Sequence, residues 1–159
     1  MARPTRRTAA RQNVLMDDVI LVAVNDSPAG FAAGQVAIEY ARRLGARLHA
    51  VTVVETGRDL AADADAVGRA ERRQQGAEAV LNRVTALGAG VGVEVEVNRR
   101  SGAVAAEILD EARSIDAGLI VMALVDRPSH VMAYIGSQTL RVMKFATVPV
   151  LVVPVLPGR

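Results

Sequence analysis

Two short apolar runs near the end of the chain, separated by a segment of helix length, constrain the fold more than any other feature. The runs cover residues 119–124 and 148–153. Strands that are covered by helices on both faces are apolar without alternation, so this spacing predicts a parallel β-helix-β unit. The loop between the runs then lies at the carboxyl end of a strand, where open α/β sheets bind their ligands.

The rest of the chain repeats this alternation. Apolar runs predict strands at residues 19–24 and 47–54, and each is followed by a segment of helical periodicity. Residues 93–97 alternate valine with glutamate, so one face of that strand is wet and the strand is expected at a sheet edge. Residues 99–102 are predicted to form the next turn. With right-handed crossovers, the chain is predicted to be an α/β three-layer sandwich, a doubly wound five-stranded parallel sheet with four helices.

Local signals place the helix ends and faces. Ser27 is predicted to cap the first helix, Pro28 to begin it and Gly45 to end it. Ser137 is an adequate cap for the last helix without any ligand. The apolar positions expected to face the core are Ala33, Ala37, Tyr40, Ala41 and Leu44 in the first helix, Ala77, Val80, Leu81, Val84 and Leu87 in the second, Val104, Ala105, Ile108, Leu109 and Ala112 in the third, and Leu140, Met143 and Ala146 in the last.

Composition narrows the class of protein. The 159 residues are 51% hydrophobic and contain no cysteine, which excludes disulfides, thiolate metal sites and cysteine nucleophiles and fits a reducing compartment. No apolar stretch approaches the ~20 residues that a membrane helix needs. We therefore expect a cytoplasmic protein with one folded domain at residues 17–156 and no membrane partner.

The first 16 residues carry a separate charge pattern. They hold four arginines and no acid, which leaves 15 basic and 17 acidic residues in the remainder of the chain. Such an arm can bind nucleic acid or an anionic membrane, or serve as a transit peptide. Because the four arginines lack neighbouring aromatic residues, a nucleic-acid partner is not expected, and residues 1–16 are interpreted as a disordered extension.

Three doubly wound classes are excluded by their missing motifs. The segment after the first strand, from Asn25 to Gly30, lacks the glycine fingerprint of a dinucleotide-binding domain. A phosphorylated receiver domain needs acidic residues at the ends of its strands, whereas Asp17 and Asp18 precede theirs. The chain contains no P-loop either.

The chain resembles the universal stress protein family from residue 19 to residue 153. The resemblance lies in the turn after the first strand (Val24, Asn25 and Ser27), in Gly102 six residues before Ile108, in the strand at residues 116–122, and in Gly136-Ser137 before the last strand. It implies the strand order 3-2-1-4-5, which again places the alternating third strand at an edge.

The resemblance also implies a site. Nucleotide-binding members of the family carry G-x2-G-x9-G-[S/T] after the fourth strand, where glycines and a helix N-terminus approach phosphates. In this chain the spacing is kept, but Ala123 and Asp126 stand at the first two glycines and only Gly136-Ser137 matches. The family's aspartate after the first strand is replaced by Asn25.

Asp126 is the most consequential of these departures. A carboxylate about 4 Å from a phosphate charge costs about 4 kcal/mol at an effective dielectric constant of about 20, or roughly a thousandfold in affinity. The neighbouring Arg127, or Mg²⁺ between Asp126 and the phosphates, would offset part of this cost.

Two functions follow. The first is a non-catalytic, homodimeric stress-response protein with a degenerate nucleotide-binding loop and no cofactor, which acts through protein partners. The alternative is a sensor that binds ATP, with Mg²⁺, through Asn25, Val53, Ala123, Arg127, Gly136, Ser137 and Gln138. No arrangement of serine, histidine and acid favours hydrolysis, so no enzyme is expected. His49 is interpreted as a packed or edge-solvated residue and His130 as a solvent-facing loop residue, rather than as a catalytic group and a phosphate ligand.

The last strand predicts self-association. The run from Val148 to Val153 is uncharged and is expected at the second edge of the sheet. An exposed apolar edge invites pairing with another strand. We expect this strand to meet its copy in a second chain about a two-fold axis.

Overall fold

The computed structural model describes residues 19–56, 65–124 and 135–154. In this part of the chain, five parallel strands form one sheet in the order β3-β2-β1-β4-β5, as predicted. The elements along the chain are β1 (Val19–Ala23), α2 (Pro28–Leu44), β2 (Arg47–Glu55), α3 (Ala66–Ala89), β3 (Val95–Gly102), α4 (Val104–Ser114), β4 (Ala117–Ala123), α5 (Ser137–Phe145) and β5 (Val150–Val153).

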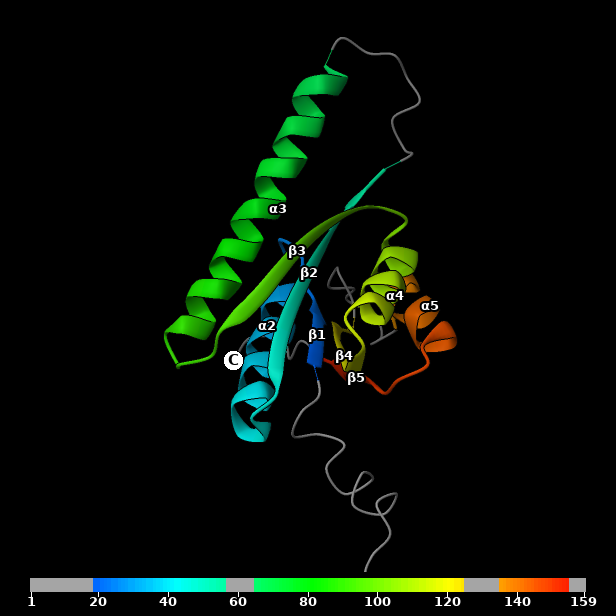
Figure 1. Ribbon diagram of the computed structural model, residues 1–159. Helices are drawn as coiled ribbons and strands as arrows, with labels where there is room; N and C mark the ends of the chain where they lie inside the picture. Colours follow the sequence, from blue (N-terminus) through cyan, green and yellow to red (C-terminus); the bar gives the residue numbers. More distant parts are fainter. Residues whose placement is uncertain (1–18, 57–64, 125–134, 155–159) are drawn as a thin grey trace, which may run out of the picture.

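The helices cover both faces of the sheet and make three layers. Figure 1 shows α2 and α3 on one side of the sheet and α4 and α5 on the other. Each side has its own apolar cluster, because alternate residues of a strand point to opposite faces. Ile20 and Val22 pack with α2 and α3, whereas Leu21 packs with α4 and α5. The three-layer, doubly wound fold is therefore confirmed.

The first turn forms as its sequence predicts. Ser27 has extended backbone angles, and its hydroxyl oxygen accepts a hydrogen bond from the Gly30 N–H at 2.9 Å. Pro28 is the first helical residue, and Gly45 ends α2 in the left-handed conformation with a φ of 65°. One predicted core position of this helix is wrong. Tyr40 is 43% exposed, and Ile38 is buried in its place.

The edge position of β3 is confirmed, but its predicted length is wrong. Residues 99–102 do not form a turn, because β3 continues to Gly102 in register with β2, which ends at Glu55. An edge strand keeps one side in contact with water, so the polar side chains of this segment do not have to enter the core. Arg99 and Arg100 instead meet acidic side chains of the neighbouring helices.

Two expectations for α5 are corrected. Gly136 is the capping residue and Ser137 the first helical residue, so the cap lies one position earlier than predicted. The buried residues of α5 are Thr139 and Val142, whereas Leu140 and Met143 are 54% and 42% exposed. The buried face of α5 is therefore rotated by about one residue from the face that its apolar residues suggest. Among the described helices, none is long and apolar enough to span a membrane.

Candidate functional site

Two of the predicted ligand-binding residues, Asn25 and Ala123, lie at the carboxyl edge of the sheet. Asn25 follows β1, Ala123 ends β4, and the two strands are neighbours in the sheet. From this edge the chain crosses to α2 on one face and to α5 on the other. A reversal of strand order of this kind opens a crevice in doubly wound sheets, and ligands bind there.

The turn after β1 is tightly constructed around Asn25. The Ser27 hydroxyl donates to Asn25 Oδ1 at 2.5 Å, and the Ser27 N–H donates to the Asn25 carbonyl oxygen at 2.9 Å. Gly30 is required by this arrangement. A Cβ at position 30 would lie 2.7 Å from the Asn25 carbonyl oxygen and 2.8 Å from its backbone nitrogen. Asn25 is thus held against the first turn of α2.

A cavity of about 270 Å³ opens beside this turn, between the end of β2 and α3. Its volume is close to the lower end of small-molecule pockets, about 300 Å³. Two predicted residues, Asn25 and Val53, line it. The other lining residues are Asp26, Thr52, Val54, Glu55, Arg73, Gly76, Ala77 and Val80.

Most of this cavity wall was not predicted. Arg73 was not among the predicted site residues, although it lies four and seven residues before Ala77 and Val80, the first predicted core positions of that helix. That helical spacing is the signal that places Arg73 over the cavity. Thr52 is 4% exposed, and a polar residue at the end of an apolar strand is the corresponding signal in β2.

The other half of the site is the passage from β4 to α5. Its two ends are joined, since the Gly136 N–H donates to the Leu124 carbonyl oxygen at 2.8 Å. The buried Thr139 hydroxyl donates to the Ala123 carbonyl oxygen at 2.9 Å. In the described part of the chain, no side chain caps α5, so the first N–H groups of this helix are directed at the crevice edge. Asp126, Arg127 and His130 lie outside the described residues.

Gln138 has a structural contact that was not predicted. Its side-chain oxygen accepts a hydrogen bond from the Ala105 N–H at 3.2 Å. Ala105 lies in the first turn of α4, whose capping residue, Ala103, has no side-chain acceptor of its own. Gln138 therefore satisfies a backbone group at the start of α4, and its oxygen is engaged there.

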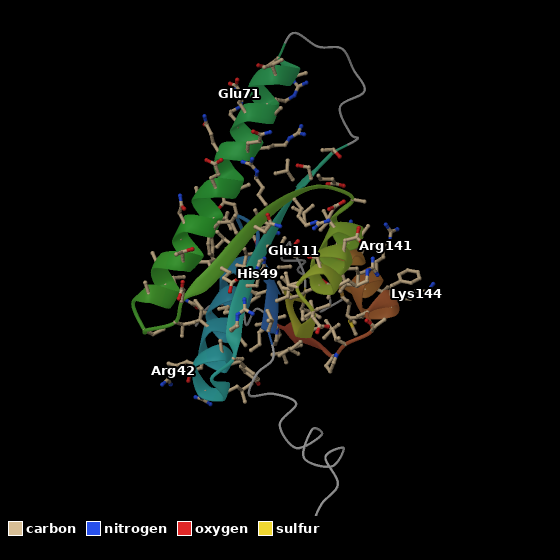
Figure 2. All side chains as sticks on the ribbon, in the orientation of Figure 1. Arg42, His49, Glu71, Glu111, Arg141 and Lys144 are labelled. Carbon is tan, nitrogen blue, oxygen red and sulfur yellow. The ribbon has the colours of Figure 1, made fainter. Side chains whose placement is uncertain are left out.

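A buried ionic cluster lies away from this crevice, between β2, β3 and α4. His49 of β2 and Glu111 of α4 are 8% and 2% exposed, and His49 Nε2 lies 2.7 Å from Glu111 Oε1 (Figure 2). Among the described residues, His49 Nε2 has no hydrogen-bond partner of suitable direction. The interpretation of His49 as a packed residue agrees with its burial.

The remaining partners of Glu111 explain how a carboxylate remains buried. Asn98 Nδ2 donates to both carboxylate oxygens at 3.0 and 3.1 Å, and Arg100 donates to one of them at 2.7 Å. Burial raises the pKa of Glu111, but the hydrogen bonds from Asn98 and Arg100 and the charge of His49 outweigh it and lower the pKa. Buried charges are stable only when they are paired in this way.

A second cavity is smaller than the one beside Asn25, and no metal site is found among the described residues. A cavity of about 150 Å³ lies between the C-terminal ends of α4 and α5, lined by residues that include Arg113, Asp116 and Phe145. None of the residues predicted to bind a ligand lines it. Within the described ranges, no group of three or more histidine and acidic side chains is placed to hold a metal ion.

Comparison with known proteins identifies the family. A sequence model described as the universal stress protein family matches residues 16–154. A search of curated proteins gave no match. A universal stress protein from Lactobacillus plantarum is 27% identical, with a TM-score of 0.71 over 86% of this chain and 97% of that one.

Two further solved structures are similar. A member of the family from Burkholderia pseudomallei is 27% identical, with a TM-score of 0.71 over 88% of this chain and 98% of its own. A universal stress protein from Archaeoglobus fulgidus in complex with dAMP is 18% identical, with a TM-score of 0.63 over 87% and 98% of the two chains. The matched residues, the strand order and the crevice together show that the chain belongs to the universal stress protein family.

Proposed function

We propose that the chain is a non-catalytic stress-response protein whose crevice binds a purine nucleoside or nucleoside monophosphate and binds ATP poorly. The cavity beside Asn25 is the observation that carries this proposal. It lies beside the turn after β1, between the end of β2 and α3, and is lined by the predicted residues Asn25 and Val53. A relative with the same fold binds dAMP.

The wall of the cavity suits a nucleobase. Val53, Val54, Ala77 and Val80 supply apolar surface, and Asn25 supplies a polar group at its margin. Ligand pockets in general combine apolar walls with a few polar groups that fix orientation. A purine ring buried against these side chains would be stabilised by the area that it removes from water.

The phosphate half of the site has fewer donors than a triphosphate needs. The Gly136 N–H and the Thr139 hydroxyl are engaged with the end of β4, and the Gln138 oxygen contacts α4. The uncapped start of α5 and the Ser137 hydroxyl remain as donors for one phosphate. The sequence adds Asp126 to this half, and each additional phosphate charge increases the repulsion from that carboxylate.

Thermal unfolding with adenosine, AMP or ATP at fixed Mg²⁺ tests the proposal. A ligand at 100 times its dissociation constant stabilises the folded chain by about 2.7 kcal/mol. We expect a shift with adenosine and AMP and a smaller one with ATP at equal concentration. The matched control is Gly76→Leu, which fills the cavity, since a Cβ at Gly76 meets no atom within 4 Å. Equal shifts in the wild type and in this variant would contradict the cavity as the site.

The proposed protein is a homodimer through β5. The Ile120 N–H donates to the Pro149 carbonyl oxygen, and the Leu124 N–H donates to that of Val153. Because backbone groups alternate in direction along a parallel strand, those of Val150 and Val152 are directed away from β4. This supports pairing with a second copy, although β5 begins at Val150, later than the predicted Val148.

Sedimentation at micromolar concentration tests the dimer. We expect the wild type to sediment as a dimer and Val152→Pro to dissociate, because proline removes an outward N–H and leaves the bonds between β4 and β5 in place. Circular dichroism is the control for folding of the variant. A monomeric wild type would remove this part of the proposal.

Action through protein partners is favoured by the surface of α5. Leu140, Met143 and Phe145 are 54%, 42% and 58% exposed on this nine-residue helix. Leu140 and Met143, three residues apart, share one face of the helix, and exposed apolar groups that lie together are typical of interaction surfaces. A photo-crosslinker at position 140 is expected to capture another protein in cells, while one at Glu71, on the exposed half of α3 (Figure 2), is not. Capture of this chain alone at position 140 would contradict a heterologous partner.

A further inference from the structure

Thr52 of β2 is a buried polar residue whose side chain has no partner in the described part of the chain. Four polar or charged residues are buried there: His49, Thr52, Glu111 and Thr139. His49 and Glu111 contact each other, and the Thr139 hydroxyl donates to the Ala123 carbonyl oxygen. Thr52 is 4% exposed, and its hydroxyl makes no hydrogen bond to any described residue. Buried hydroxyls are nearly always paired, so this one is suited to a partner from outside the chain.

The Thr52 hydroxyl is reached from the cavity between the end of β2 and α3. Thr52 lines this cavity together with Ala77 and Val80 of α3. Its side chain lies on the same face of β2 as that of Ala50, two residues earlier, which packs under α2 and α3. Among the described residues, the fully enclosed side-chain polar atom that lacks a hydrogen-bond partner is His49 Nε2. Thr52 Oγ1 also lacks a partner, so it is not fully enclosed, and the surface that it keeps lies in the cavity.

The cavity changes character from its rim to its inner end. Asn25 and Asp26 line it and are exposed, so they belong to the rim. Ala77 and Val80 are buried and belong to the inner end, where Thr52 is the buried polar residue of the lining. A ligand that fills the cavity therefore places its inner edge against one hydroxyl in otherwise apolar surroundings.

This arrangement determines which edge of a purine nucleotide enters the cavity. The ribose is attached to the five-membered ring of the base, and the ribose hydroxyls and the phosphate need water or polar groups, which the cavity offers at its rim. The six-membered ring then enters first. In adenine and guanine, the edge of this ring carries nitrogen atoms and an exocyclic amino or oxo group. A threonine hydroxyl both donates and accepts, so it can form a hydrogen bond with either base.

We infer that Thr52 selects the base of the ligand through a hydrogen bond from its hydroxyl to the polar edge of the six-membered ring. Thr52 lies in the cavity of the proposed function, on which this inference rests. The site then discriminates a purine from an apolar ring of the same shape, because the apolar ring would leave the Thr52 hydroxyl unpaired.

Titration calorimetry of the wild type and Thr52→Val with two nucleotides tests the inference. The nucleotides are AMP and the ribonucleotide of benzimidazole, whose six-membered ring has the same shape but carries neither nitrogen nor an amino group. We expect the wild type to bind AMP about tenfold more tightly, the difference made by about one hydrogen bond. Valine keeps the shape of threonine without its hydroxyl, so this preference should disappear in Thr52→Val. Thr52→Ser keeps the hydroxyl and should keep the preference. Thr85→Val, which removes a hydroxyl bonded within α3, is the control and should also keep it.

Urea denaturation of the free chain separates binding from folding. Because the Thr52 hydroxyl has no partner among the described residues, Thr52→Val should leave the stability of the free chain unchanged or raise it. Thr139→Val removes a bonded hydroxyl and should lower the stability. An equal loss in the two variants would show that Thr52 has a partner within the chain and would overturn the inference.

The affinities distinguish failure of this inference from failure of the proposed function. A wild type that binds AMP, with the same preference in Thr52→Val, would overturn the role of Thr52 and leave the proposed function intact. Absence of binding of AMP by the wild type would overturn both.

Discussion

His49 Nε2 lies 2.7 Å from Glu111 Oε1, and both side chains are almost completely buried between β2 and α4. The same carboxylate accepts hydrogen bonds from Asn98 and Arg100 of β3. β2 is thus joined to the consecutive elements β3 and α4 through one charged group. Removal of one partner from a buried ionic cluster leaves the others without compensation, which typically costs about 3–5 kcal/mol.

Glu111→Ala is therefore expected to lower the free energy of unfolding by about 3 kcal/mol, measured by urea denaturation. The matched control is Glu78→Ala. Glu78 also pairs with an arginine of β3, Arg99 at 2.8 Å, but its side chain is 65% exposed. Exposed ion pairs contribute about 1 kcal/mol or less, so the control should change stability little. Equal effects in the two variants would show that the buried cluster has no special role.

The same carboxylate predicts a pH dependence of stability. The pKa of Glu111 is lowered from 4.5 in the folded chain, since hydrogen bonds from Asn98 and Arg100 outweigh the raising effect of burial. A lowered pKa gives stability that is complete above pH 4.5 and is lost as the pH falls through the folded pKa. The stability difference between the wild type and Glu111→Gln should accordingly shrink below pH 4.5. A difference that grows with falling pH would contradict this sign.

Gly30→Ala is expected to destabilise the chain and to displace Asn25. The new Cβ would lie within 2.8 Å of backbone atoms of Asn25, which cannot move as a flexible side chain can. Gly34→Ala in the same helix is the control, because its Cβ would make ordinary contacts of 3.6 Å with Val24 and Val84. Alanine also has the higher helix propensity, by about 1 kcal/mol. Melting temperatures should thus fall for Gly30→Ala and stay level or rise for Gly34→Ala.

Thr139→Val tests the connection between α5 and β4. The variant keeps the shape of the side chain but removes the hydrogen bond to the Ala123 carbonyl oxygen, which is buried. An unsatisfied buried acceptor costs about 1–3 kcal/mol. Thr85→Val removes a similar bond, from the hydroxyl to the Leu81 carbonyl oxygen, at an exposed position of α3. Chemical denaturation should show a loss for the first variant and little change for the second.

The sheet was predictable because buried parallel strands leave a simple signature. The number and type of the strands followed from the apolar runs of β1, β2, β4 and β5. The alternation of valine and glutamate at residues 93–97 predicted β3. The start of α2 was predictable for a local reason, since Ser27 and Pro28 act within a single turn. The strand order followed from the resemblance to the family.

The failures share a physical cause, because each depends on contacts between distant segments. Arg99 and Arg100 resemble a turn in isolation and extend β3 only because β2 is long enough to pair with them. Glu111 follows Ile108 by three residues and shares its buried face, but no local signal shows that Asn98 and His49 will meet it. The prediction of the cavity wall was incomplete for the same reason, because Arg73 and Gly76 line the cavity from α3.

Titration calorimetry of the wild type with AMP and ATP, at equal free Mg²⁺, tests the central claim most directly. The account predicts that AMP binds with one site per chain and at least about tenfold more tightly than ATP, since each added phosphate charge is repelled by the carboxylate of Asp126. In Asp126→Gly this difference should shrink. Tighter binding of ATP than of AMP by the wild type would contradict the account.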